Sequence, residues 1–260
     1  MEREQFSVST IRGPRSPAGI ALPVLSDTGF SNLDRTHIFG GLIGQSAPWM
    51  WHTYFNDFDS LAEFNGITDT ADWDVTTTGS TPTFALTDGD NGLAIITLST
   101  ADNDHVFYQK KGESFKYVAR SPLLFGMRFK VVDATQCDII AGLMITDTTP
   151  LTTVTDGIYF QKDDGDAYLD FHVAKNTTAT DVTNLATLVD DTFITLQFAY
   201  DGGSKIWYGT NGSALGSVAL TNVSDDEELT ISFGIQAGEA TNVKTMTIDY
   251  VYAAKYTGRS

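Results

Sequence analysis

Short runs in which apolar and polar residues alternate cover most of the chain after about residue 55. The alternation is clearest in four runs, in which every second residue is a large apolar one: residues 122–132, 192–201, 228–237 and 244–256. A period of two is typical of strands that bury one face. These runs therefore predict an antiparallel sheet.

Shorter runs of the same kind predict further strands. They are residues 73–78, 83–87, 93–98, 105–109, 115–119, 138–146, 157–162, 167–175 and 205–210. Between them lie turn sequences such as TDGDNG, KDDGDA, YDGGSK and GTNGSA, which place Asp, Asn or Gly where a hairpin needs a positive φ. No run has the period of an amphipathic helix. The sequence predicts an all-β fold, an antiparallel two-sheet sandwich of the jelly-roll type.

The first 50 residues have a different character. Pro14, Pro17 and Pro23 fall within a short stretch that suits neither a helix nor an inner strand, because each proline lacks a backbone N–H donor. The next stretch, HIFGGLIGQSAPWMW, is apolar and Gly-rich without a regular period. We therefore expect an extended N-terminal arm with an apolar junction over residues 1–50, followed by a β-sandwich domain over residues 51–260.

The net charge also differs between the first 50 residues and the rest of the chain. Residues 1–50 contain four basic and four acidic side chains, so the other 210 residues carry the whole net charge of −17. A body this acidic repels phosphate groups and anionic lipid, which argues against nucleic acid or a membrane surface as a partner. The chain has neither a signal-peptide pattern nor a stretch approaching the roughly 20 apolar residues of a membrane span. Cys137 lies alone in an apolar run and predicts a buried thiol and a reducing compartment.

Two parts of the chain resemble known families. The later part resembles the second half of concanavalin A-like (laminin-G-like) jelly rolls. It consists of the segments GIYFQKDDGDAYLDFHVAKN and LVDDTFITLQFAYDGGSKIWYGTNGSALGSVAL. The earlier part resembles sandwich domains in virion proteins of tailed bacteriophages. It consists of the segments WDVTTTGSTPTFALTDGDNGLAIITL and ADNDHVFYQ. Together they span residues 55–256. An arm followed by a jelly roll is similar to capsid decoration (cement) proteins.

Catalytic motifs are missing from the sequence. Glycanases on this fold use carboxylates in a pattern resembling E-x-D-x-x-E, and none of the seven Glu has an Asp two residues later. The four His show no close metal-binding spacing, and the stretch GQSAP does not follow a strand as a nucleophile elbow must. We therefore expect a protein that is not an enzyme and that has no cofactor.

The sequence contains candidates for two kinds of ligand site. Jelly rolls of the lectin type often bind calcium through loop carboxylates, which makes Asp163, Asp164 and Asp166 candidates, although ordinary turn residues are the favoured interpretation and no metal is expected. A glycan platform is the other candidate, because aromatic rings can stack on sugars. Its expected residues are Trp207, Tyr208 and Tyr168, with Trp73 and Tyr159 as further aromatics, and Asp166, Asp170 and His172 share one strand face.

The resemblance implies a virion structural protein. It would bind the outside of a phage capsid after synthesis in the host cytoplasm and stabilise the shell through an arm that bridges neighbouring subunits. Its partners would be the major capsid protein and copies of itself, as a dimer or a trimer. The arm residues expected to contact the capsid are Arg12, Arg15, Ile38, Phe39, Leu42, Ile43, Trp49, Met50 and Trp51. The alternatives are a carbohydrate-binding, lectin-like head-fibre or host-recognition module and, less favoured, a glycanase.

Overall fold

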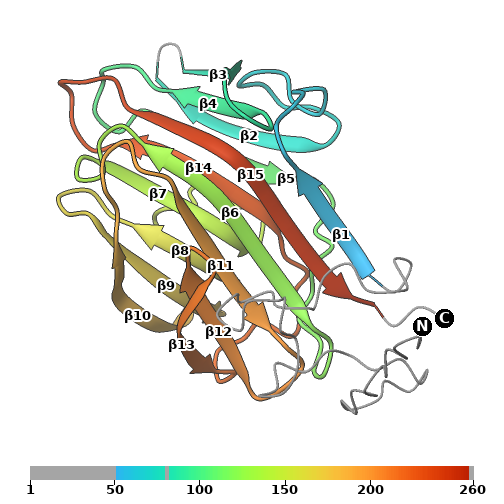
Figure 1. Cartoon of the computed structure of the whole chain (residues 1–260). Helices are drawn as coiled ribbons and strands as arrows, with labels where there is room; N and C mark the ends of the chain where they lie inside the picture. The colour runs from blue at the N-terminus through green and yellow to red at the C-terminus, as the bar shows by residue number, and fades with distance from the viewer. Residues whose placement is uncertain (1–50, 80–81, 258–260) are drawn as a thin grey trace, which may run out of the picture.

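The computed structural model describes residues 51–79 and 82–257, and they form strands joined by turns and loops (Figure 1). The strands are β1 Trp51–Asn56, β2 Trp73–Thr78, β3 Thr83–Thr87, β4 Leu93–Thr97, β5 His105–Lys110, β6 Leu123–Val131, β7 Cys137–Met144, β8 Gly157–Lys162, β9 Tyr168–Lys175, β10 Thr178–Thr187, β11 Ile194–Tyr200, β12 Lys205–Thr210, β13 Ser213–Ala219, β14 Thr230–Ala237 and β15 Thr245–Tyr256. No helix that could cross a membrane occurs in this described part.

The strands form two sheets that lie against each other as layers. The eight-stranded sheet has the order β13-β12-β11-β6-β15-β4-β3, with β1 also paired to β15, and the seven-stranded sheet has the order β10-β9-β8-β7-β14-β5-β2. Every pair of neighbouring strands is antiparallel. From β4 to β7 the chain alternates between the two sheets at each step (Figure 1). This arrangement confirms the predicted jelly-roll sandwich.

The core lies between the sheets because alternate residues of each strand point inward. Phe198 of β11 meets Phe160 and Phe171 of the opposite sheet at ring-centroid distances of 6.4 and 6.0 Å. All three side chains are fully buried. Burying several aromatic rings in this way supplies much of the hydrophobic stabilisation of the sandwich.

The four strongest alternating runs are confirmed as β6, β11, β14 and β15. Residues 115–119 do not form a strand, and Phe115 makes only an isolated bridge to Leu229. Strands β1, β10 and β13 were not predicted. Strand β10 has the sequence TATDVTNLAT and its side chains are mostly exposed, so it lacks the apolar alternation by which the other strands are recognised.

Candidate functional site

The outward face of the seven-stranded sheet carries polar side chains beside a buried apolar cluster that includes Phe107, Val154 and Tyr159. Ile158 and Phe160 of β8 point into the core, so Tyr159 and Gln161, which alternate with them, point outward. The strand register then places side chains of six strands in one row across the sheet. That row consists of Gln109, Ser232, Gly142, Tyr159, His172 and Asp181.

The centre of this row is an aromatic pair with a carboxylate beside it. The rings of Tyr159 and His172 are stacked, with centroids 4.9 Å apart and planes 20° apart. Nδ1 of His172 lies 2.7 Å from Oδ1 of Asp181 on the neighbouring strand. Burial, with a further contribution from Asp181, raises the pKa of Tyr159 to about 12. The Tyr159 hydroxyl therefore keeps its proton at neutral pH and can donate a hydrogen bond.

Two glycines leave room for the rings on this face. A Cβ atom at Gly142 would lie 2.5 Å from Cα of Tyr159, and one at Gly234 would lie 2.3 Å from a ring carbon of Phe107. Contacts this short are not tolerated, so a side chain at either position would displace its neighbour. These two glycines thus allow Tyr159 and Phe107 to lie close to the sheet.

A second row lies next to the first and adds amide and carboxylate groups. It consists of Phe107, Gly234, Ile140, Gln161 and Asp170. The Gln161 amide donates to Asp163 at 2.7 Å, and Asp170 accepts the backbone N–H of Asn184 at 2.7 Å. These bonds fix the orientation of side chains that could bind hydroxyl groups.

Asp138 stands at the edge of this face and is 8% exposed. Its two oxygens accept the N–H of Asp164 at 2.7 Å and the side-chain amide of Gln236 at 3.2 Å. Burial raises the pKa of Asp138, and the carboxylates of Asp164 and Asp163 raise it further, against the opposing effect of the Asp164 N–H. Asp138 is therefore the carboxyl group on this face that retains a proton at a higher pH than usual.

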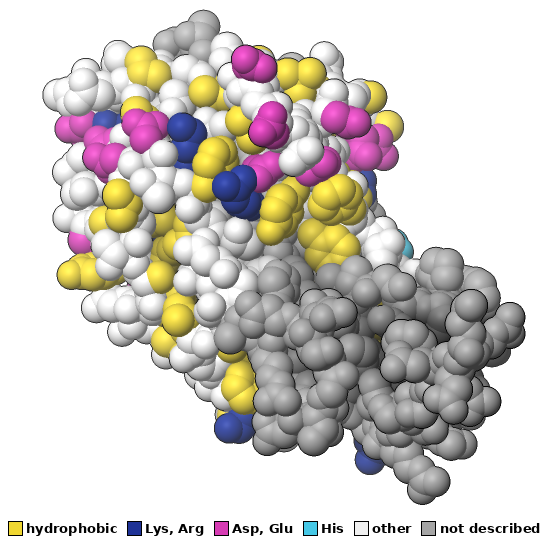
Figure 2. Space-filling view, in the orientation of Figure 1, with side chains coloured by type: hydrophobic (Ala, Val, Ile, Leu, Met, Phe, Trp, Pro, Cys, Tyr) yellow, Lys and Arg dark blue, Asp and Glu magenta, His cyan; other side chains and the backbone are white. Residues whose placement is uncertain are grey.

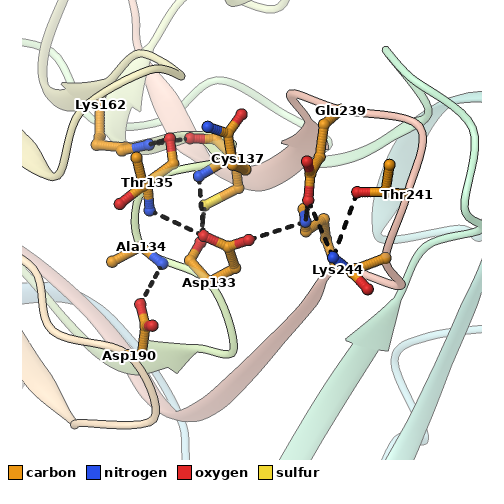
Figure 3. Close-up of polar contacts among 11 residues, drawn as sticks. Asp133, Ala134, Thr135, Cys137, Lys162, Asp190, Glu239, Thr241 and Lys244 are labelled. Carbon is orange, nitrogen blue, oxygen red and sulfur yellow. Dashed lines mark hydrogen bonds and ion pairs between the residues drawn. The ribbon is translucent and has the colours of Figure 1, made fainter.

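A buried polar network holds the loops around the start of β7 (Figure 3). The Lys162 ammonium donates to the carbonyl oxygens of Thr135, at 3.0 Å, and Cys137. Nζ of Lys244 lies 2.9 Å from a carboxylate oxygen of Asp133 and 2.6 Å from one of Glu239. Lys162 and Lys244 are 1% and 0% exposed. The network joins the β6–β7 loop to the end of β8 and to the β14–β15 loop.

The predicted calcium candidates belong to the turn next to this network. Their groups form separate bonds: Asp163 accepts from Gln161, the Asp164 N–H donates to Asp138, and Asp166 accepts the N–H of Tyr168. Among the described residues, no group of three or more acidic, His or Cys side chains is arranged to hold a metal ion. Cys137 is buried in the core, and burial raises the pKa of its thiol to about 12.

The residues predicted as a glycan platform do not lie on one surface. Tyr208 of β12 points inward, and its ring centroid lies 5.1 Å from that of Phe171. The preceding residue, Trp207, points the opposite way and packs on the outward side of the eight-stranded sheet. Tyr168 begins β9 in the other sheet and is 46% exposed, whereas Trp73 is buried in the core. Adjacent strand positions point to opposite faces, and this separates Trp207 from Tyr208.

The arm residues from Arg12 to Met50 lie outside the described residues, so their predicted contacts stay predictions. Trp51 is the first residue of β1, and its ring packs edge-on against Tyr256 with centroids 5.5 Å apart. Sequence reasoning named Tyr159 and His172 separately but did not pair them. Their pairing depends on the register between β8 and β9.

No protein-family model and no curated protein matches the sequence. Solved structures do match. An endo-1,3-β-glucanase from Streptomyces sioyaensis has a TM-score of 0.55 and 14% identity, over 82% of this chain and 99% of the glucanase. A glycoside hydrolase family 16 endo-glucanase from Bacteroides ovatus has a TM-score of 0.52 and 13% identity, over 77% and 99%. The carbohydrate recognition domain of Emp46p has a TM-score of 0.50 and 11% identity, over 80% and 100%.

These similarities correct the prediction that the protein is not an enzyme. Several of the similar structures are glucanases, so the absence of an E-x-D-x-x-E pattern does not exclude catalysis on this fold. None of the similar structures named here is described as a virion protein, and the capsid role gains no support from them. At these low identities the similarity establishes the fold alone, an antiparallel two-sheet jelly roll.

Proposed function

We propose that the outward face of the seven-stranded sheet binds a polysaccharide. The observation that carries this proposal is the stacked Tyr159–His172 pair, with Asp181 and Gln161 on the neighbouring positions of the same face. Sugar rings have apolar faces that pack on aromatic rings, and their hydroxyl groups bind carboxylate, amide and imidazole groups. The glucanases and the carbohydrate recognition domain among the similar structures support the same ligand class.

The shape and charge of the face favour a neutral chain of sugars. The span from Gly142 to Asp181 crosses three strand spacings, roughly 14 Å, which is longer than one sugar ring. Asp138, Asp170 and Asp181 lie on this face, and the outward positions of β5, β14, β7, β8 and β9 contain no Lys or Arg. Uronic acid polymers would therefore be repelled.

Tyr159→Ala is expected to weaken glucan binding at least about tenfold, which corresponds to 1.4 kcal/mol, because His172 loses the buried ring on which it stacks. The measurement is isothermal titration of the full chain with laminarin, a neutral glucan, and with polygalacturonate, which should not bind. Tyr250→Ala, on the other sheet, is the matched control. His172→Ala should reproduce the loss. Laminarin binding that is unchanged in both folded variants would contradict the proposal.

Hydrolysis of the bound glycan is a second candidate function, and the observation in its favour is Asp138. A glycoside hydrolase needs a carboxylic acid that donates a proton to the leaving oxygen and a second carboxylate that acts as nucleophile or base. The raised pKa of Asp138 suits the first role. Asp163 and Asp170 lie on the same face and could provide the second.

Asp138→Asn is expected to lower the release of reducing sugar from laminarin by about a hundredfold or more, since the amide cannot donate the proton. Laminarin affinity should stay within about twofold of wild type. Wild-type activity should fall as pH rises through the raised pKa of Asp138, because the active form carries the proton. The exposed Asp102→Asn serves as control. Equal turnover by both variants would remove Asp138 from the reaction and leave the binding proposal standing.

A further inference from the structure

The outward face of the eight-stranded sheet carries an apolar cluster of its own, separate from the core. Leu124 of β6, Ala199 of β11 and Ala254 of β15 are fully buried there. The side chains of Trp51, Trp207 and Tyr252 pack on them. We call these six residues the outer aromatic cluster. It runs across five neighbouring strands, from β1 at one side to β12 at the other.

Such a cluster is unusual in its position. Outward faces of antiparallel sheets normally carry polar residues, because they face water. Here the apolar character continues to Phe55 of β1, which is 58% exposed, and its ring lies 6.4 Å from that of Tyr252. Figure 2 shows hydrophobic side chains mixed with charged ones on this side of the molecule. The rings of Trp51, Trp207 and Tyr252 are partly exposed over neighbouring strands, and apolar rings gathered in this way are typical of a contact surface.

The segment that could cover the cluster is next to it in the chain. Trp51 belongs to the cluster, and residues 37–50, HIFGGLIGQSAPWM, precede it directly and contain no Asp, Glu, Lys or Arg. From β15 to β12 the cluster crosses three strand spacings, roughly 14 Å. About five extended residues span that distance, so the 14-residue segment is long enough to cross the whole cluster.

Net charge favours residues 37–50 over a second copy of the protein as the partner of the outer aromatic cluster. The 210 residues after the arm carry the whole net charge of −17, so two bodies brought face to face repel each other. Residues 1–50 have no net charge, because they contain four basic and four acidic side chains. A segment joined to the cluster through Trp51 also has an effective concentration in about the millimolar range. We propose that residues 37–50 of the same chain lie across the outer aromatic cluster.

Hydrogen–deuterium exchange of the full chain tests this docking. Backbone amides of residues 37–50 should exchange at least about tenfold more slowly than in a synthetic peptide of the same sequence. Trp207→Ala should remove most of that protection, because it removes one of the two indole rings of the cluster. Tyr168→Ala, on the opposite sheet, should leave the protection unchanged.

A second variant separates docking from folding. Leu42→Asp combined with Ile43→Asp changes only the segment, and it should raise exchange in residues 37–50 while the strands keep their protection. Wild-type exchange at the rate of the free peptide would overturn the proposal. Protection that disappears as the protein is diluted would also overturn it, because a second copy would then supply the contact.

Discussion

Phe233→Ala is expected to lower the free energy of unfolding by about 4 kcal/mol. Phe233 lies in β14, between β7 and β5 of the seven-stranded sheet, and is fully buried. Its ring is stacked on Tyr108 at 5.4 Å and meets Trp73 edge-on at 5.5 Å. Truncation removes these contacts and leaves a cavity, because β14 is hydrogen-bonded on both sides and cannot move inward to fill it.

Urea denaturation of the two proteins measures the difference. Val189→Ala is the control, since that side chain is 59% exposed and its truncation should change the free energy of unfolding by no more than about 0.5 kcal/mol. A loss below about 1 kcal/mol for Phe233→Ala would contradict the close packing between the sheets. Because Phe233 points away from the glycan face, the folded fraction of the variant should keep its laminarin affinity.

Lys244→Met is expected to lower the free energy of unfolding by about 3 kcal/mol. The methionine fills the space of the lysine stem, but Asp133 and Glu239 lose the ammonium that lies 2.9 and 2.6 Å from them. Two carboxylates then face each other without a cation. The control is Lys175→Met, which breaks an exposed ion pair with Asp225 and should have little effect. A stability equal to wild type would contradict the role of the network.

The same variant should change the response to pH. A hydrogen bond from Lys244 holds the pKa of Glu239 below its usual value. Burial alone would raise the pKa of Asp133, but hydrogen bonds from Lys244 and from the backbone amides of Gln136 and Thr135 outweigh burial and lower it. Carboxylates with lowered pKa stabilise the fold above their unfolded pKa, about 4, and this stabilisation is lost as pH falls through the folded values. Denaturation at several pH values should therefore show the difference between wild type and Lys244→Met shrinking below about pH 4.

The strands that pack one face on the core could be predicted from the sequence. In β11, for example, Ile194, Leu196 and Phe198 alternate with Thr195 and Gln197, and burial of one face is what produces this pattern. Strands β10 and β13 lie at the sheet edges, where side chains are exposed on both faces. No alternation is required of such strands, so their sequences resemble loops.

The candidate site could not be assembled from the sequence, because it depends on register between distant strands. Ser232 lies beside Gly142, and Gly142 beside Tyr159, only through backbone pairing across β14, β7 and β8. A shift of one residue would turn Tyr159 into the core. Lys244 illustrates the same limit, since a lysine in a polar loop is expected in water, whereas here it is buried and bonded to Asp133, a residue 111 positions away.

The sequence alone thus determined an acidic, all-β jelly roll, because alternation and turn residues reflect local geometry and one-sided burial. It also set apart the neutral first 50 residues through their proline content and charge balance. The tertiary structure decided which side chains share a face: it separated Tyr168, Tyr208 and Trp207 and placed Tyr159 against His172. Pairing between strands far apart in the chain fixes these neighbours, and no local pattern records that pairing.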